Sequence, residues 1–187
     1  APEKIALLPQ TEAVTAKGFD VLCFTDDVDE FAVQMLMEYD GKQFANICKD
    51  DLNLSSDEEK KALTEKNEAA KEMLDEMKGW LGDDVTAVKF SDQLGTHAVC
   101  LSSEGYVSLD MAKILSRMPG ANDGVKAQLV LEINKDHKVA EKLFDLFAND
   151  KAQLEKYTKI LYNEARLVSG LEVENPTEFA DMIADLM

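Results

Sequence analysis

Near the end of the chain, apolar residues recur at helical spacing in two stretches, Asp150 to Gly170 and Asn175 to Met187. Gln153 lies three residues after Asp150, the spacing of a capping box at a helix start. Pro176 and Glu178 follow Asn175 as first-turn signals of a second helix, which is too short to be stable alone. The apolar positions of the two helices are Leu154, Tyr157, Ile160, Leu161, Ala165, Val168, Phe179, Met182, Ile183 and Leu186.

A long helix is predicted to begin near Ser56, because Ser56 and Glu59 have the capping-box spacing. Its surface positions include Lys61 and Glu65, an i,i+4 pair of opposite charge suited to a solvated face. One apolar stripe runs through this otherwise charged segment, at Leu63, Ala70, Leu74, Met77 and Leu81.

Strand and helix patterns alternate after Gly82. Val85 to Phe90 and Ala98 to Ser102 have strand character, and we expect them to pair as a hairpin. Leu129 to Ile133 supplies a third strand, and Val139 to Phe147 a helix that follows it. The predicted fold class is α+β, a small mixed sheet with helices that ends in a helical hairpin.

The first part of the chain is predicted to be a small α/β unit. Val21 to Phe24 is a short apolar run suited to a buried strand, and Asp27 can cap a helix that follows it. Polar residues from Asp50 to Ser56 then indicate a boundary. We therefore divide the chain into residues 1–49 and residues 50–187.

The charge excludes some partners. A net charge of −17 and a pI near 4.4 would repel nucleic acid and anionic membrane surfaces. No apolar run approaches membrane-spanning length, so no membrane partner is expected either. With 45% hydrophobic and 30% charged residues, the chain has the composition of a folded protein rather than of a disordered one.

The cysteines favour a reducing compartment. Cys23, Cys48 and Cys100 are odd in number, widely spaced and without a CxxC pair, which suits free thiols better than disulfides or a zinc site. The start, Ala1 to Lys4, has neither an initiating Met nor a signal-peptide pattern. We expect a cytoplasmic fragment of a larger protein.

Support for catalysis in this chain is weak. His97 and His137 are far apart in sequence, and neither lies in an HExxH arrangement. Folding could still bring one of them to a cysteine and a carboxylate, so a His/Cys hydrolase stays an alternative. Phosphate-binding loops are missing, and the acidic clusters near Asp27 and Asp57 are explained by helix capping rather than by calcium.

The segment Ser108 to Met118 is predicted to be a short amphipathic helix. Packing into the core is the simplest explanation for its apolar stripe. Methionines also suit a surface that must fit many partners, and Gly105 and Pro119-Gly120 would let the helix project from the body. We therefore predict a partner-binding helix, with the apolar contacts Leu109, Met111, Ile114, Leu115 and Met118.

Several different short motifs follow one another along almost the whole chain, and their order and spacing are together characteristic. Those of the first part are Gly18 to Leu22, Thr25 to Phe31 and Asp40 to Phe44. Those of the second part are Val88 to Leu94, Val99 to Ser102, Leu131 to Asn134 and Asn175 to Phe179. Together they resemble the end of the middle domain and the C-terminal domain of the heat shock protein 90 family, in its bacterial branch. Lys135 departs from this pattern, because the family often has proline there.

The resemblance implies a role without catalysis. In this family the ATP and Mg²⁺ bind an N-terminal domain and the middle domain adds a catalytic arginine, both of which precede this chain. No cofactor and no enzymatic activity are therefore expected here. The last helices would form a homodimer as a four-helix bundle, and the helix from Ser108 to Met118 would hold non-native client proteins. The apolar residues of the two terminal helices given above would form the dimer interface.

One further alternative stays open, because periodicity does not distinguish a face that packs inward from one that meets a partner. In a monomeric scaffold the terminal helices would pack on the α+β body, and only the methionine-containing helix would bind other proteins.

Overall fold

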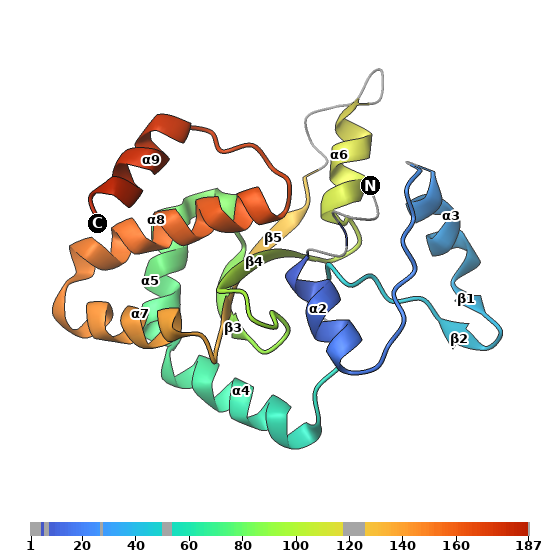
Figure 1. The fold of residues 1–187 in the computed structure, drawn as a ribbon, viewed down its shortest axis with the longest axis horizontal. Coiled ribbons are helices and arrows are strands. Elements are labelled where there is room, and N and C mark those ends of the chain that lie inside the picture. Colours follow the sequence, from blue (N-terminus) through green and yellow to red (C-terminus); the bar gives the residue numbers. More distant parts are fainter. Residues whose placement is uncertain (1–4, 6–7, 27, 50–53, 118–125, 187) are drawn as a thin grey trace.

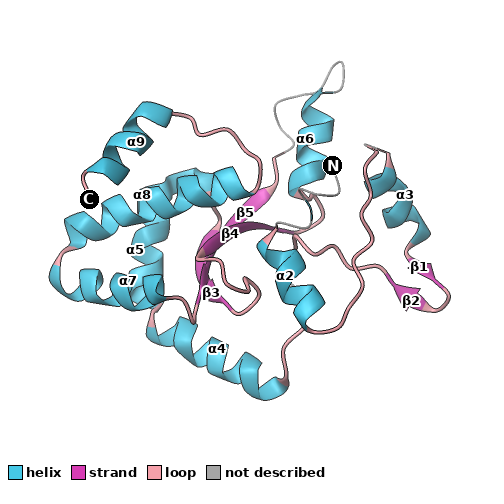
Figure 2. Cartoon of the chain, in the orientation of Figure 1, coloured by secondary structure: helices cyan, strands magenta, loops and turns pink. Residues whose placement is uncertain are grey.

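The computed structural model of the protein describes residues 5, 8–26, 28–49, 54–117 and 126–186, which form a mixed α+β fold (Figure 1). Helices surround one three-stranded sheet, and the first part of the chain contains a separate two-stranded hairpin (Figure 2). The predicted fold class is confirmed at this level.

The central sheet consists of β3 (Ala87–Ser91), β4 (Val99–Glu104) and β5 (Gln128–Asn134) in the order β3-β5-β4. Strand β5 runs parallel to β3 and antiparallel to β4. The predicted hairpin between the first two strands is therefore wrong, because β5 lies between them. The segment from residue 92 to residue 98 connects the two outer strands instead of reversing the chain between neighbours. A pairing with a distant strand has overridden the local turn signal.

Apolar residues of the three strands form one buried face of the sheet. Phe90 pairs with Ile133, and Ile133 pairs with Val99, so the three side chains form a row across it. All three are at most 1% exposed. This face packs against α5 (Lys71–Leu81), α7 (Lys138–Asn149) and α8 (Lys151–Val168), which complete the main hydrophobic cluster (Figure 1).

The long helix predicted from Ser56 is two helices. The capping box is confirmed, since the hydroxyl of Ser56 accepts from the Glu59 N–H and the Glu59 carboxylate accepts from the Ser56 N–H. Helix α4 (Asp57–Ala69) then ends at Ala70, whose φ of −95° and ψ of 0° are not helical, and α5 follows at once. A short 3-10 turn, η1 (Gly82–Asp84), leads from α5 toward β3.

The first part of the chain contains α2 (Pro9–Ala16), α3 (Asp29–Leu36) and the hairpin of β1 (Glu38–Tyr39) and β2 (Lys42–Gln43). The predicted strand at residues 21–24 is wrong. This stretch is irregular, and Leu22 and Phe24 are 65% and 47% exposed. Within the described residues no strand pairs with it, so its backbone cannot form a ladder. The predicted helix is present as α3, but the proposed cap, Asp27, lies outside the described residues.

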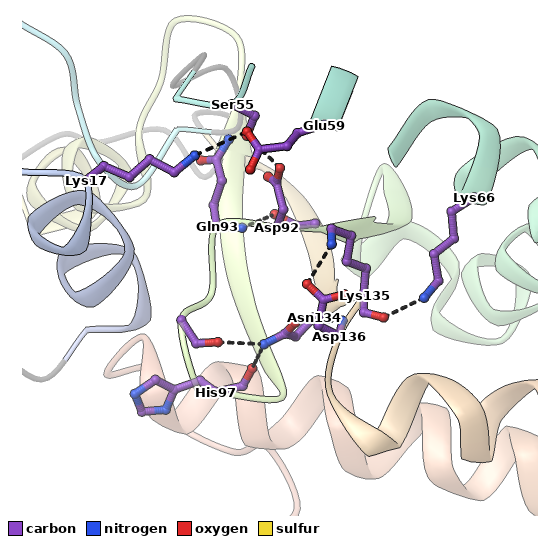
Figure 3. Close-up of polar contacts among 12 residues, drawn as sticks. Lys17, Ser55, Glu59, Lys66, Asp92, Gln93, His97, Asn134, Lys135 and Asp136 are labelled. Atoms are coloured by element: carbon purple, nitrogen blue, oxygen red, sulfur yellow. Dashed lines mark hydrogen bonds and ion pairs between the residues drawn. The ribbon is translucent and has the colours of Figure 1, made fainter. Parts of the chain in front are cut away.

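Helix α2 packs against the part of the chain that follows residue 50. The Glu12 carboxylate accepts from the Thr96 hydroxyl at 3.1 Å, and Lys17 donates to the Leu54 carbonyl at 2.9 Å. Figure 3 shows Lys17 beside Glu59, whose carboxylate lies 3.7 Å away. The hydrogen bonds from Ser56, and then the Lys17 charge, hold the pKa of Glu59 below its usual value. The first α/β unit thus contacts the second through α2.

Candidate interaction surfaces

One stripe of α8 faces the sheet. Leu154 and Ala165 have no exposed surface, and Leu161 retains 4%. All three belong to the same buried cluster as the strands. Their assignment to a partner interface is corrected here, because their helical spacing turns them toward the chain's own core and leaves no surface for a second molecule.

The remaining predicted residues of α8 lie beside this stripe. Tyr157 is partly buried and packs against the core, Ile160 retains 9% exposure, and Val168 is partly exposed. Leu167, next to Val168, is 53% exposed and adds to the same region. Apolar surface of α8 is therefore available mainly in its last turn.

The last helix, α9 (Pro176–Ala184), has no buried residue. The predicted cap is confirmed, because the Asn175 side chain accepts from the Glu178 N–H at 3.2 Å. The predicted interface residues Phe179, Met182, Ile183 and Leu186 are all partly exposed. A helix this short depends on packing, and its apolar face is covered only in part by the chain itself.

An apolar groove lies where α8, the linker and α9 meet. Leu167, Val173, Pro176 and Phe179 line it, with Glu172 at its edge. The groove joins the exposed last turn of α8 to the partly exposed face of α9. Val173 and Pro176 were not assigned to the interface from sequence, since the first lies in a linker and the second reads only as a helix-start residue.

A second cavity, of about 190 Å³, lies on the other side of α9. Trp80 lines it from the end of α5, Asp84 from η1, and Arg166 and Tyr162 from α8. Burial, and then the nearby Asp84 carboxylate, raise the pKa of the Tyr162 phenol, which keeps its proton. Met182 of α9 also lines this cavity. Residues of α5, η1, α8 and α9 therefore share one cavity.

Helix α6 (Leu109–Arg117) matches the predicted partner-binding helix, and Figure 1 shows it projecting beside the ends of β4 and β5. Its start is anchored. Ser108 accepts from the Met111 N–H at 3.0 Å and also donates to the Glu30 carboxylate. Lys113 donates to the Ser169 carbonyl at 3.1 Å, at the end of α8.

The apolar residues of α6 divide between the body and the surface. Met111 is 3% exposed, so its assignment as a client contact is corrected: it packs α6 onto the chain. Leu109, Ile114 and Leu115 are partly exposed, while Met118 lies outside the described residues. Tyr106, just before the helix, is 74% exposed and was not predicted from the pattern.

Both histidines contribute to polar contacts that support the fold. The imidazole Nδ1 of His137 accepts from the Val139 N–H at 3.2 Å and so caps α7. Figure 3 shows the carbonyl of His97 accepting from the Asn134 amide at 2.8 Å, while its imidazole points away from Asn134. That imidazole lies 3.6 Å from the Glu12 carboxylate. Neither histidine lines the two cavities described above.

The Asn134 region also explains the departure at the next position. The Lys135 N–H donates to the Ser91 carbonyl at 3.0 Å, a bond that a proline could not make. The Lys135 carbonyl accepts from Lys66 of α4 at 2.5 Å (Figure 3). The backbone of Lys135 therefore ties the end of β5 to both β3 and α4, and the bond to β3 requires a residue other than proline.

Cys100 is buried and Cys48 is partly buried, and both environments disfavour the thiolate form. Burial, and then the Asp110 charge, raise the pKa of Cys48 to about 11. Burial, and then the Glu132 charge, raise the pKa of Cys100 well above its usual value. Because the thiolate is the reactive form, these two cysteines do not favour the hydrolase interpretation. Cys23 is exposed, on the irregular stretch before α3.

Within the described residues, no group of three or more His, Cys, Asp or Glu side chains is arranged to hold a metal ion. Of the helices in the same part of the chain, none combines the length and the apolar character needed to cross a membrane.

The sequence of the chain is similar to those of known proteins. A sequence model described as "Hsp90 protein" matches residues 2–187. The chain is 50% identical over 185 residues to the chaperone protein HtpG of Clostridium perfringens (strain 13 / Type A). It is 43% identical over 185 residues to that of Bacillus subtilis (strain 168) and 47% identical over 186 residues to that of Clostridium acetobutylicum. Each match covers 99% of this chain but 29% of the relative.

Proposed function

Because this chain belongs to the Hsp90 protein family, we propose that it is the homodimerisation and client-binding portion of an ATP-dependent chaperone. Residues 1–49 would be the end of the middle domain and residues 50–187 the C-terminal domain. The chain spans 29% of the length of its relatives, so the ATPase, with its ATP and Mg²⁺, is assigned to the remainder of the parent protein. We propose a cytoplasmic location, as for a chaperone that meets newly made chains.

The observation that carries the dimer proposal is the partly exposed face of α9. This short helix has three large apolar residues, Phe179, Met182 and Ile183, and Leu186 follows its end, yet none of the four is fully buried by the chain itself. The adjoining groove extends this surface onto α8. Two copies related by a twofold axis would each present the same patch, so α8 and α9 of both could close a four-helix bundle.

In the parent protein such a dimer would have a clear use. Two N-terminal domains joined through one stable C-terminal contact meet at a high effective concentration, set by geometry rather than by dilution. A transient clamp driven by ATP could then form and open while the chains stay together. This chain would supply the permanent contact and would take no part in the hydrolysis step.

Client binding is proposed for the outer face of α6. Leu109, Ile114 and Leu115 leave apolar surface partly open, and the neighbouring Tyr106 extends it. The anchors at Ser108 and Lys113 hold the start of the helix, so the surface is presented without loss of the helix itself. Partly exposed apolar side chains of this kind suit non-native proteins, which offer apolar segments in many sequences.

The dimer proposal is tested by light scattering of the 187-residue chain over a dilution series. We expect twice the chain mass at micromolar concentration. A monomer at every concentration would contradict the proposal and favour the monomeric scaffold, which the burial of Leu154, Leu161 and Ala165 within the chain supports.

The client proposal is tested by suppression of aggregation of a chemically denatured protein. Ile114→Ser with Leu115→Ser should weaken suppression several-fold, because both substitutions remove exposed apolar surface. Lys142→Ser on α7, which removes an exposed cation instead, is the matched control and should change nothing. Equal activity of the two variants would contradict a role for α6.

A further inference from the structure

The linker between α8 and α9 is only partly held by its own apolar side chains, since Leu171 packs against the main hydrophobic cluster and Val173 lines the apolar groove. Glu172 and Glu174 are exposed, and Leu171 and Val173 are only partly buried. The Gly170 and Leu171 N–H groups bond back to the end of α8, to the carbonyls of Leu167 and Arg166. After Leu171 the direction of the chain must therefore be set by something other than the helix end.

Arg166 makes several of the contacts that hold this segment. Its Nε donates to the Glu172 carbonyl at 2.9 Å, and one terminal nitrogen donates to the Glu174 carboxylate at 3.0 Å. The same nitrogen donates to the Tyr162 hydroxyl at 3.3 Å. Its side chain is 15% exposed, far less than the 75% of Glu174. One guanidinium thus contacts α8 and two points of the linker.

Tyr162 connects this contact to the core. The guanidinium carbon of Arg166 lies 5.6 Å from the centre of the Tyr162 ring, within the range of a cation–π interaction. Tyr162 is 6% exposed and belongs to the main hydrophobic cluster. Arg166 is therefore held against a buried ring of the core, and the linker is held against Arg166.

We infer that Arg166 is a positioning residue that fixes the direction in which α9 leaves α8, and so sets the geometry of the dimer interface. This inference rests on the proposed dimer. It requires only that α9 carries part of the interface, because a short helix on a loose linker would lose conformational entropy each time a second chain bound it.

The chemistry requires arginine rather than any cation. The planar guanidinium presents several N–H donors in a fixed fork, so it can bond to a carbonyl and a carboxylate while its face lies on a ring. A lysine ammonium could replace one of these contacts at a time. Arg166→Lys keeps the charge and therefore separates positioning from simple attraction to Glu174.

The test measures the dimer dissociation constant and, in the same samples, hydrogen exchange of the α9 amides. Arg166→Ala and Arg166→Lys should both raise the dissociation constant about tenfold or more, the loss expected for one charge-assisted contact. Both should speed exchange in α9 while the thermal midpoint of the α/β body stays close to that of the unchanged chain. Lys142→Ala, which removes a cation from an ion pair on α7, is the matched control and should leave all three measurements unaltered.

Glu174→Gln provides a second variant on an exposed residue, in case Arg166→Ala affects folding through the Tyr162 contact. It should show the same changes to a smaller degree. Unchanged dimerisation and unchanged α9 exchange in the arginine variants would overturn the inference. If the unchanged chain were monomeric, the proposed function would fail instead, and faster α9 exchange in the variants would still support positioning by Arg166.

Discussion

Helices α8 and α9 have similar sequence signals and opposite surroundings. Both begin at a residue whose side chain accepts from an N–H three positions on, Asp150 for α8 and Asn175 for α9. Both carry an apolar stripe. Helix α8 buries its stripe in the core, whereas no residue of α9 is buried. Periodicity therefore indicates that a face exists, and only the packing shows what the face is for.

The difference also separates the residues that stabilise the fold from those available to bind a partner. Residues of α8 contribute to the same cluster as the sheet, so changes there should affect the whole chain. Residues of α9 contact α8 and the linker, so changes there should affect α9 and any partner but leave the body folded. The following substitutions test this division, beginning with the largest expected effect.

Leu161→Asp should unfold the chain. A carboxylate at a position with 4% exposure has no partner and little access to water, so we expect a loss of about 4 kcal/mol or more in unfolding free energy. Leu161→Met is the control and should cost less than about 1.5 kcal/mol, because it nearly conserves volume. Chemical denaturation measures both. A folded Leu161→Asp chain would contradict the assignment of α8 to the core.

Ile183→Asp should weaken the dimer and leave the body of the chain folded, the opposite of the result expected for Leu161→Asp. Ile183 is partly exposed, so the unfolding free energy of the body should change by less than about 1 kcal/mol. The dimer dissociation constant should rise about a hundredfold, because the change occurs in both copies of a symmetric interface. Ala180→Asp, on the exposed side of the same helix, adds the same charge and should leave the dimer nearly intact. Equal effects of the two would argue against an interface on this face.

Replacing the capping residue of α8 or of α9 by alanine should destabilise that helix by about 1 kcal/mol, the usual cost of losing such a cap. Asp150→Ala should lower the midpoint of global denaturation, since α8 unfolds only with the core. Asn175→Ala should leave that midpoint nearly unchanged and should instead reduce the protection of α9 amides in the monomer. A global loss from Asn175→Ala would show that α9 is part of the core after all.

Lys156→Ala should have the smallest effect. Its ammonium lies 2.7 Å from the Asp185 carboxylate at the end of α9, but the two side chains are 32% and 65% exposed. We expect less than about 1 kcal/mol, and less still in high salt, from an ion pair in contact with solvent. Exchange of α9 amides at low and high salt measures it. A large effect that persists in salt would mean that this pair holds α9 more firmly than its exposure indicates.

Local signals correctly predicted most helices and the caps at Ser56, Asp150 and Asn175. The capping box at Ser56 and Glu59 and the start of α9 at Asn175 depend on residues three apart, and so they can be read directly. Strand identity was also predictable where a short and mainly apolar run has the length of a strand, as at Leu129 to Ile133 in β5. Long-range pairing was not, because nothing near residue 91 indicates that β5 will lie between β3 and β4.

The candidate surfaces were predictable only in part. The stripe on α6 was evident, but which of its residues face the body was not, and Met111 is buried. Arg166 gave no signal beyond that of a basic residue in the last turn of a helix. Its role depends on the position of Tyr162 and on the path of the linker, both of which result from tertiary packing.

Hydrogen exchange of the unchanged chain at two concentrations tests most directly whether the open face of α9 closes against a second copy. Protection of amides in residues 176–186 should rise with protein concentration, while that of the α8 amides at residues 154–165 should be high at both. The account would be contradicted if the protection of α9 amides were equal at both concentrations and the chain had the mass of a monomer in both samples.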